Sequence, residues 1–455
     1  MRSKLLSAAA MALALMAGEY VTPAYAFAQN GPSTAAPGQD ALSTAQRDAV
    51  LAAIRQAIQS SYVFPERMPG IFARLDAAQA TDRYDVSSPG ELAGLITADL
   101  GEASQDGHVY LAYAPDRYAA ATSAGPTDQT LSQMDAAVAR RDNYGLTATR
   151  ILPGNVRYLK IGAFHWVSDE TGQAYDDAMR FLKGGDAAII DLRGNGGGSS
   201  EAVQYLVSHF LKAGTLEITF LRAGQEPVQT RALDHLPAGR LLDTPLYVLI
   251  DEASASAAES FAYDVQQFEL GQLVGAGTAG AANNNDFTPI TPGFMLSLSV
   301  GRPVHPVSGG NWEGVGVSPD TLTPSTQALD TAHAEALQML LTTPASPAAR
   351  ADYAWALTDV NARLKPPLAS TDLLQSAPGA YRNYVVTSEG GSLAIARPGH
   401  PLWPAQRKLS PLTGDGLFAV EGIDTLRVGF KDGAIQLFWK DESAPRDIPR
   451  NGSTN

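Results

Sequence analysis

The sequence predicts an α/β core that is preceded by an N-terminal helical domain and followed by a small C-terminal β-rich domain. Three observations predict this organisation. From about residue 155, short apolar strands alternate with helices through connecting loops, which is the pattern of α/β proteins. Residues 43 to about 105 carry helix start signals and apolar residues at helical spacing. The segment after about residue 377 carries the turn signals of antiparallel strands, at Glu389-Gly390-Gly391 and at Asp432-Gly433.

The expected segments follow from these changes in pattern. A stretch rich in Gly, Pro, Ser, Ala and Gln separates the chain start from the first helix and has the composition of a flexible linker. The expected bounds are a signal peptide at 1–28, the linker at 29–42, the helical domain at 43–125, the core at 126–325, a helical connector at 326–370 and the β-rich module at 371–447.

Composition excludes several classes of protein. The 455 residues are 45% hydrophobic and 18% charged, which is typical of a globular chain long enough to bury a full core. The net charge of −14 repels phosphate backbones, so we expect no nucleic-acid partner. The chain has no cysteine, which excludes disulfides, thiol catalysis, iron–sulfur clusters and thiolate zinc sites.

The first residues have the features of a secretory signal peptide. Arg2 and Lys4 give a positive start, an apolar run extends from Leu5 to Gly18, and small-x-small cleavage sites follow at 24–28. The apolar run is too short to span a membrane, and no other run approaches ~18 residues. We therefore expect a soluble periplasmic or secreted protein without a stable membrane anchor.

Two helix starts are marked in the N-terminal domain. Ser43 and Gln46 form a capping-box pattern, and apolar residues then recur at four-residue spacing up to Ile58. Ser88–Glu91 supplies a cap, a proline at the first helical position and a returning glutamate. Both patterns predict helices that bury one apolar face.

The core alternates strands with helices, and sites in such folds lie at the carboxyl ends of the strands. The expected strands are 158–161, 187–190, 246–250 and 294–300. The expected helices are 175–182, 202–211, a helix with Phe261, Val265 and Phe268 on its apolar face, and the segment 329–364.

Ser256 is the first candidate for chemistry. It lies near the start of the helix that follows strand 246–250, where unpaired backbone N–H groups and the helix dipole favour negative charge. An oxyanion at Ser256 would be stabilised there, and the neighbouring alanines leave room for a substrate carbonyl. The alternative is that Ser254 or Ser256 is only a helix N-cap, which is a common role for serine at such a place.

The glycine-rich loop Gly194–Gly198 is the second candidate. It follows a buried strand, and consecutive glycines let backbone N–H groups approach a ligand closely. A dinucleotide site is a weak interpretation, because Ser199 stands where the third glycine of that fingerprint belongs. An oxyanion hole that faces a serine is the other use. A simple tight turn rarely requires three glycines in a row.

A serine nucleophile needs a base, and histidine is one option. The chain has seven histidines, and no pair has metal-ligand spacing on one helix face, so we expect no metal site. His108 follows Asp106 and Gly107 and opens an alternating segment, which places it at a turn-to-strand corner where a side chain can point into a cleft. His165 and His305 remain alternatives.

Lysine is the other option for a base. No lysine occurs between Lys212 and Lys365. A serine–lysine dyad whose lysine closely follows Ser256 is therefore excluded, and a lysine base would have to come from a distant part of the chain.

These candidates fall within a set of motifs. In chain order the motifs are Asp106–His108, Asn155–Leu159, Asp191–Gly198, Ser256–Glu259 and Asn311–Asp320. Together they resemble the S41 serine peptidases, which include tail-specific proteases, the tricorn core and the interphotoreceptor retinoid-binding protein modules. The similarity covers about residues 45–325 and is greatest to the retinoid-binding-protein-like branch, which lacks a PDZ domain. The resemblance implies a ClpP/crotonase-like core of β-α repeats.

The resemblance also implies a role for each matching position. Ser256 matches the nucleophile, and His108 matches its general base. Glu313 matches the glutamate that orients the base. The backbone N–H groups of Gly197 and Ala257 match the oxyanion hole, although the neighbouring glycines remain alternatives to Gly197.

One position departs from the family pattern. The serine that stands beside the histidine in the tricorn-like arrangement has no match, because Gly107 occupies that place. Ser104 could substitute only if its loop folds back. Without the resemblance, Glu313 would be interpreted as a solvated carboxylate or as the partner of Arg302.

The resemblance therefore predicts an exported serine peptidase that forms an acyl-enzyme with peptides or unfolded chains and needs no cofactor. A peptide could add as an extended strand beside a sheet. One alternative is a binding module for an apolar small molecule, and another is a serine hydrolase for a non-peptide ester or amide. The C-terminal module resembles the small β-barrel appendages of exported hydrolases.

Overall fold

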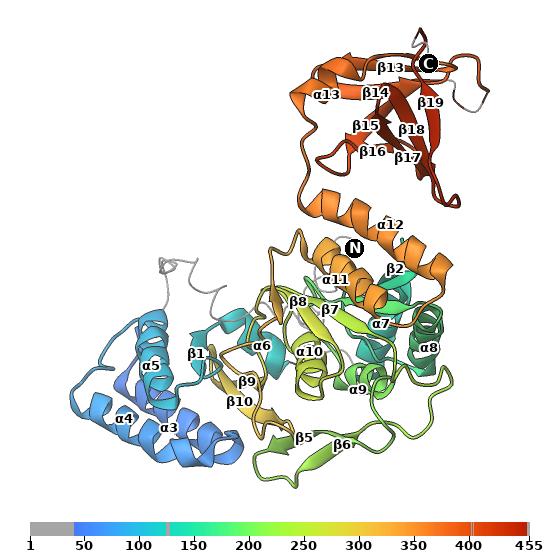
Figure 1. The fold of residues 1–455 in the computed structure, drawn as a ribbon. Helices are drawn as coiled ribbons and strands as arrows, with labels where there is room; N and C mark the ends of the chain where they lie inside the picture. The colour runs from blue at the N-terminus through green and yellow to red at the C-terminus, as the bar shows by residue number, and fades with distance from the viewer. Residues whose placement is uncertain (1–40, 124–127, 402, 404, 453–455) are drawn as a thin grey trace, which may run out of the picture. The chain divides into compact units, whose positions relative to one another are not determined.

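Figure 1 shows the computed structural model, which describes residues 41–123, 128–401, 403 and 405–452. The chain divides into two units. One holds the described residues up to 150 together with 158–184 and 190–325, and the other holds 151–157, 185–189 and the residues from 326 onward. The predicted signal peptide and most of the predicted linker lie outside the described residues. Of the helices that are described, none combines the length and the apolar character needed to cross a bilayer.

The first unit begins with helices whose predicted caps are confirmed. The Ser43 side chain accepts the Gln46 N–H, and the Gln46 side chain accepts the Ser43 N–H at 2.8 Å, which completes the capping box. Ser88 caps the later helix by accepting the Glu91 N–H. The elements are α3 (Thr44–Ser61), η1 (Pro65–Arg67), α4 (Met68–Ala80), α5 (Pro89–Ser104), α6 (Pro115–Thr122), α7 (Asp128–Arg141) and η2 (Asn143–Gly145).

The apolar faces of α3, α4 and α5 share one core with two strands. Leu111 of β1 (Tyr110–Tyr113) and Phe294 of β10 (Phe294–Val304) are buried in this core. β1 pairs with β10 in antiparallel register, with Tyr110 opposite Ser297. This packing fixes the corner between α5 and β1, which is where His108 lies.

A six-stranded sheet forms the α/β core, with strand order β11-β8-β7-β4-β3-β2. The central strands β4 and β7 are buried along their whole length, as their unbroken apolar runs predict. The strands are β2 (Leu146–Leu152), β3 (Val156–Ile161), β4 (Ala187–Asp191), β7 (Leu246–Ile250), β8 (Gln272–Gly275) and β11 (Thr321–Leu322). The helices that follow them are α8 (Asp169–Lys183), α9 (Ser200–Ser208) and α10 (Ala257–Gln267).

A second, antiparallel sheet was not predicted as a separate layer. The strand expected at 294–300 exists as β10, but it lies in a sheet of order β1-β10-β5-β6, with β9 also paired to β10. Its alternation of apolar residues could not reveal which strands it pairs with. The remaining strands are β5 (Leu216–Arg222), β6 (Val228–Arg231) and β9 (Asn284–Thr291).

Two predicted helices have different limits. The helix expected at 202–211 ends at Ser208, where the next two N–H groups, those of His209 and Phe210, bond carbonyls only three residues back in the chain, at 3.1 and 2.9 Å. The helical segment expected at 329–364 is two helices, α11 (Ala328–Thr342) and α12 (Pro347–Leu364). Ser346 caps α12, and the proline at its first position disfavours a helical conformation in the preceding residue.

The second unit ends in the β-rich module, which the sequence predicted. Its eight strands pair in sequence order, and the Asn451 N–H bonds the Ala380 carbonyl at 2.8 Å, so the two ends of the sheet meet (Figure 1). Both predicted turns, Gly390–Gly391 and Asp432–Gly433, have positive φ angles and join hairpins, as two-residue turns require. The elements are α13 (Thr371–Ser376), β12 (Gly379–Tyr381), β13 (Tyr384–Glu389), β14 (Ser392–Ala396), β15 (Arg407–Pro411), β16 (Phe418–Val420), β17 (Ile423–Lys431), β18 (Ala434–Trp439) and β19 (Arg446–Pro449).

The helical region contains a buried carboxylate whose removal should destabilise it. Asp99 is fully buried and accepts hydrogen bonds from Arg74 at 2.7 Å, Arg83 at 2.9 Å and the Tyr84 hydroxyl at 2.8 Å. We expect Asp99→Asn to lower the free energy of unfolding by about 2 kcal/mol, because several charge-assisted bonds are weakened together. Chemical denaturation measures this change.

Asp76→Asn is the matched control for that measurement. Asp76 also pairs with an arginine, Arg55, at 2.6 Å, but its side chain is 70% exposed. Exposed ion pairs contribute little, so we expect almost no change. Equal effects of the two substitutions would contradict a special role for the buried carboxylate.

Candidate active site

Ser256 lies in a strained turn between β7 and α10. Its backbone has φ 52° and ψ −114°, a conformation that residues other than glycine rarely adopt. Such strain at a strand-to-helix turn is typical of serines that present a nucleophilic hydroxyl. Ser256 is half-buried, whereas Ser254 is fully buried and its hydroxyl donates to the Leu192 carbonyl at 2.9 Å. Ser254 therefore has a structural role, and Ser256 is the accessible serine of this turn.

The glycine loop that follows β4 packs directly against this turn. The Ala255 N–H donates to the Asn195 carbonyl at 2.9 Å. Gly197 has φ +109°, and a Cβ added there would lie 2.8 Å from the Ser256 Cβ and 2.9 Å from the Ala255 carbonyl oxygen. Only glycine fits this position. The glycine at 197 therefore allows the backbone of its loop to pack closely against Ser256.

The two expected oxyanion donors differ in their hydrogen bonding. The Gly197 N–H already donates to the Asn195 side chain at 2.8 Å, so in this conformation it is used within its own loop. Ala257 is the first residue of α10, where an N–H group has no partner within the helix. The geometry therefore favours Ala257 as a donor, while Gly197 would have to give up or share its bond to Asn195.

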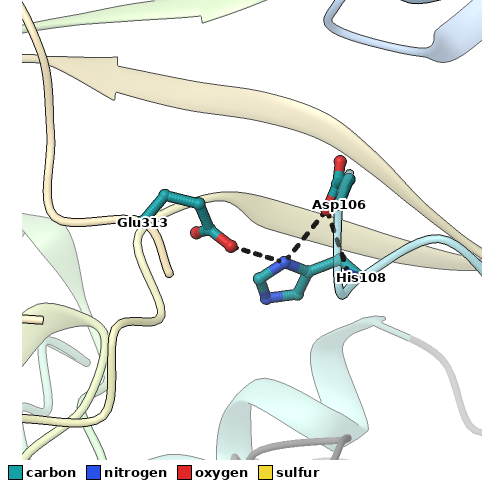
Figure 2. Close-up of side chains that lie close together, drawn as sticks. All are labelled: Asp106, His108 and Glu313. Carbon is teal, nitrogen blue, oxygen red and sulfur yellow. Dashed lines mark hydrogen bonds and ion pairs between the residues drawn. The ribbon is translucent and has the colours of Figure 1, made fainter. Parts of the chain in front are cut away.

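His108 lies between two carboxylates (Figure 2). Its Nδ1 is 3.0 Å from Glu313 Oε1 and 3.5 Å from Asp106 Oδ1, and its backbone N–H donates to Asp106 Oδ1 at 3.0 Å. The Nδ1 contacts are close enough for ion pairs but lie away from the direction of a well-formed hydrogen bond. Nε2 lies on the far side of the ring from both carboxylates.

The electrostatic environment of His108 favours its charged form. Burial opposes protonation, but the attraction of the nearby Asp106 and Glu313 carboxylates outweighs it and raises the pKa of His108 to about 9. Burial also opposes ionisation of Asp106, yet its bonds to His108 hold the pKa of Asp106 below its usual value. At neutral pH the site therefore holds an imidazolium beside two carboxylates.

Glu313 is fixed by backbone groups rather than by an arginine. Its Oε2 accepts the N–H groups of Ala282 and Asn283, both at 2.8 Å, which leaves Oε1 for His108. Arg302 instead lies over the Phe64 ring, 5.0 Å from its centre. The pairing of Glu313 with His108 thus replaces the alternative pairing with Arg302.

The other two histidine candidates lie in different surroundings. His305 is fully buried, with Nε2 3.3 Å from Asp264, and burial lowers its pKa to about 4. A substrate could not reach it. His165 is partly exposed and lies 3.3 Å from Asp142. In the described part of the chain, neither is bonded to Ser256.

Ser256 and His108 are themselves not joined. Among the residues that the structure describes, no hydrogen bond links their side chains. Catalytic hydrogen bonds are often long without substrate and tighten only when it binds. The structure therefore forms the His108–Glu313 pair and the Ser256–Gly197 contact as two separate halves.

Asp106 is a site residue to which the sequence analysis gave no role. Its Oδ1 lies 3.5 Å from the His108 Nδ1, so it is a second carboxylate beside the imidazole. The Ser104 hydroxyl accepts the Asp106 N–H at 3.2 Å and so serves the turn, and in the described residues no hydrogen bond joins it to His108. The signal in the sequence is the spacing Asp106-Gly107-His108, since an aspartate two residues before another residue can accept that residue's backbone N–H.

The same three side chains also have the donor atoms of a cation site. One donor atom from each of Asp106, His108 and Glu313 lies within 4.8 Å of the others, and this is the one such group in the described residues. Three protein ligands with an open position are typical of catalytic zinc sites. The group fits a protonated imidazole equally well, because both carboxylates face the same ring nitrogen.

Comparison with known proteins decides the family. The model of peptidase family S41 matches residues 155–323, and the model of the N-terminal domain of peptidase S41 in eukaryotic IRBP matches residues 40–143. The chain belongs to peptidase family S41. The S41 model spans the Ser256 turn, the glycine loop and Glu313, and the IRBP model spans Asp106 and His108.

Two curated carboxy-terminal processing proteases are similar to this S41 chain. CtpB of Bacillus subtilis is 28% identical over 161 residues, which is 35% of this chain and 32% of the relative. A carboxyl-terminal-processing protease of Synechocystis is 27% identical over 156 residues, which is 33% of this chain and 34% of the relative. The alignments span about a third of each relative's length.

Solved structures similar to this S41 chain share little sequence with it. The photosystem II D1 C-terminal processing protease matches with a TM-score of 0.43 at 17% identity, covering 62% of this chain and 94% of the other. A lipoprotein from Streptococcus agalactiae matches with a TM-score of 0.41 at 15% identity, covering 64% and 96% of the two chains.

The close approach of Gly197 to Ser256 gives a prediction. We expect Gly197→Ala to lower the free energy of unfolding by about 1–3 kcal/mol, because the new Cβ meets backbone atoms and the positive φ is strained. Gly196→Ala is the matched control in the same loop, since its Cβ would meet nothing within 4 Å. Thermal unfolding of both variants measures the difference, and equal melting temperatures would contradict the close packing.

Proposed function

We propose that the chain is an exported serine peptidase that cleaves peptide bonds through an acyl-enzyme at Ser256. The observation that carries the proposal is the ion pair between His108 and Glu313, because a base and an orienting acid are held together by segments far apart in the sequence. The strained backbone of Ser256 and the partial exposure of this residue support the choice of nucleophile.

The chemistry of the proposed reaction follows the serine hydrolase pattern. His108 Nε2 takes the proton of the Ser256 hydroxyl as the oxygen attacks the peptide carbonyl, and Glu313 and Asp106 stabilise the imidazolium that forms. The Ala257 N–H at the start of α10 stabilises the oxyanion, and the loss of one such donor typically costs roughly 10²–10³ in rate. The proton then passes to the leaving amine, and water releases the acyl group.

The substrate class follows from the relatives and the sequence. Both curated relatives carry names that describe carboxy-terminal processing, which supports a polypeptide substrate for this chain. An extended peptide could bind by adding a strand to a sheet edge. The proposed export to the periplasm or beyond rests on the signal-peptide features of residues 1–28.

A fluorophosphonate probe tests the nucleophile directly. We expect the wild type to be labelled at Ser256 and Ser256→Ala to remain unlabelled, because the probe reacts only with an activated serine. His108→Ala should slow labelling by about 10³-fold or more. Ser260→Ala, one turn further along α10, is the matched control and should be labelled normally.

The same experiment distinguishes the alternatives. Labelling that persists in excess chelator agrees with a proton rather than a cation between His108 and its carboxylates, whereas its loss would favour a metal. A wild type that is never labelled and turns over no peptide, yet binds an apolar ligand, would favour a binding module over a peptidase.

The raised pKa of His108 predicts how activity depends on pH. Because the base must be neutral to accept a proton, the labelling rate should rise with pH and reach half of its plateau near pH 9. Glu313→Gln removes one carboxylate from Nδ1, so its midpoint should move to lower pH while its plateau falls. Rate constants measured from pH 6 to 10 test both expectations, and a flat profile would contradict the role of His108.

A further inference from the structure

Glu259 is a buried carboxylate that the proposed mechanism does not use. It lies in the first turn of α10 and is fully buried. Its Oε2 accepts the N–H groups of Ser256 and Ala281, both at 2.9 Å. Its Oε1 accepts the Thr278 hydroxyl at 2.5 Å and the Gly280 N–H at 2.6 Å. Every hydrogen bond to this carboxylate therefore comes from the Ser256 turn or from one loop.

That loop continues directly to Glu313. The N–H groups of residues 280 and 281 bind Glu259, and those of the next two residues, Ala282 and Asn283, bind Glu313. Thr278 also accepts the Val317 N–H at 2.7 Å, and the Gly280 carbonyl accepts the Gly314 N–H at 2.8 Å. Hydrogen bonds therefore join the loop 278–283 to the segment 313–317 at the start, the middle and the end of the loop.

Helix capping accounts for only part of this arrangement. A glutamate at the third position of a helix commonly reaches back to the N-cap N–H, which here is the bond to Ser256. The three bonds to the loop 278–283 have no part in capping. Burying a carboxylate is costly unless it is well paired. The burial of Glu259 therefore depends on the donors that the loop 278–283 supplies in its observed position.

We propose that Glu259 is a positioning residue that couples the strained backbone of Ser256 to the loop that holds Glu313 against His108. One carboxylate then aligns the nucleophile and the acid–base pair together. The effect on rate rests on the proposed function, whereas the effect on His108 can be measured whether or not the protein is a peptidase.

Glu259→Gln tests the coupling with little change of shape. A glutamine has only one acceptor oxygen, so either the Ser256 and Ala281 N–H groups or the Thr278 and Gly280 donors lose their acceptor and face an NH2 group. The loop should then shift, and Glu313 should move away from His108. We expect labelling to slow by about 10²-fold, as small misplacements of reacting groups can do.

The decisive measurement is the titration of His108, followed by NMR of histidine-labelled protein. We expect the His108 midpoint in Glu259→Gln to move from the wild-type value toward the ~6.5 of an unperturbed imidazole. Glu217→Gln is the matched control, because Glu217 is also a buried glutamate but lies on β5 and is bonded to neither Ser256 nor the loop 278–283. It should leave the midpoint and the labelling rate unchanged.

A second variant covers the case in which Glu259→Gln does not fold. Thr278→Val keeps the side-chain shape but removes one donor to Glu259, and it should move both readouts in the same direction by a smaller amount. A His108 midpoint that is unchanged in the folded variants would overturn the coupling. A midpoint that moves in a protein that is never labelled would uphold the coupling and refute the peptidase function instead.

Discussion

The short pairing of β1 with β10 is the constraint on which the candidate site depends. β1 has only four residues, and it aligns with β10 so that Tyr110 faces Ser297. The helices α3, α4 and α5 bury their apolar faces against these two strands, which makes the pairing part of a core rather than an isolated edge. Because His108 lies two residues before β1, this packing brings it to the loop that carries Glu313.

The residues of the candidate site come from segments attached to two different sheets. β4 and β7 are neighbours in the six-stranded sheet, and they are followed by the glycine loop and by the Ser256 turn, where backbone atoms meet closely. The antiparallel sheet supplies His108 through β1 and reaches Glu313 through the chain after β10. The Ser256–Gly197 contact and the His108–Glu313 pair are each stabilised by their own backbone contacts. Both can therefore form without a direct bond between Ser256 and His108.

The protonated form of His108 stabilises the folded protein, whereas the proposed reaction needs the neutral form. Its pKa in the folded protein is about 9, above the ~6.5 of an unfolded chain, so protonation favours the folded state. This contribution is fully present below about pH 6.5 and is lost as the pH rises through about 9. The neutral imidazole that a serine nucleophile needs is therefore the less stabilising form. Electrostatic strain of this kind is common where groups serve function rather than fold.

Local patterns in the chain predicted the features that depend only on neighbouring residues. The capping box at Ser43, the cap at Ser88 and the two-residue turn at Asp432–Gly433 follow from local hydrogen bonding and backbone freedom, and all three occur as predicted. The motifs around His108 and Ser256 also identified the family, because several residue types recur in one order.

Tertiary structure alone decided which distant groups meet. No local pattern shows that Glu313 pairs with His108 rather than Arg302, that Asp106 flanks the same imidazole, or that the Gly197 N–H is used by its own loop. Nor could the alternation of residues 294–300 reveal a second sheet, since a strand's pattern records which face is buried but not its partners. These contacts join segments separated by long stretches of chain, and their geometry is set by packing that no short window of sequence contains.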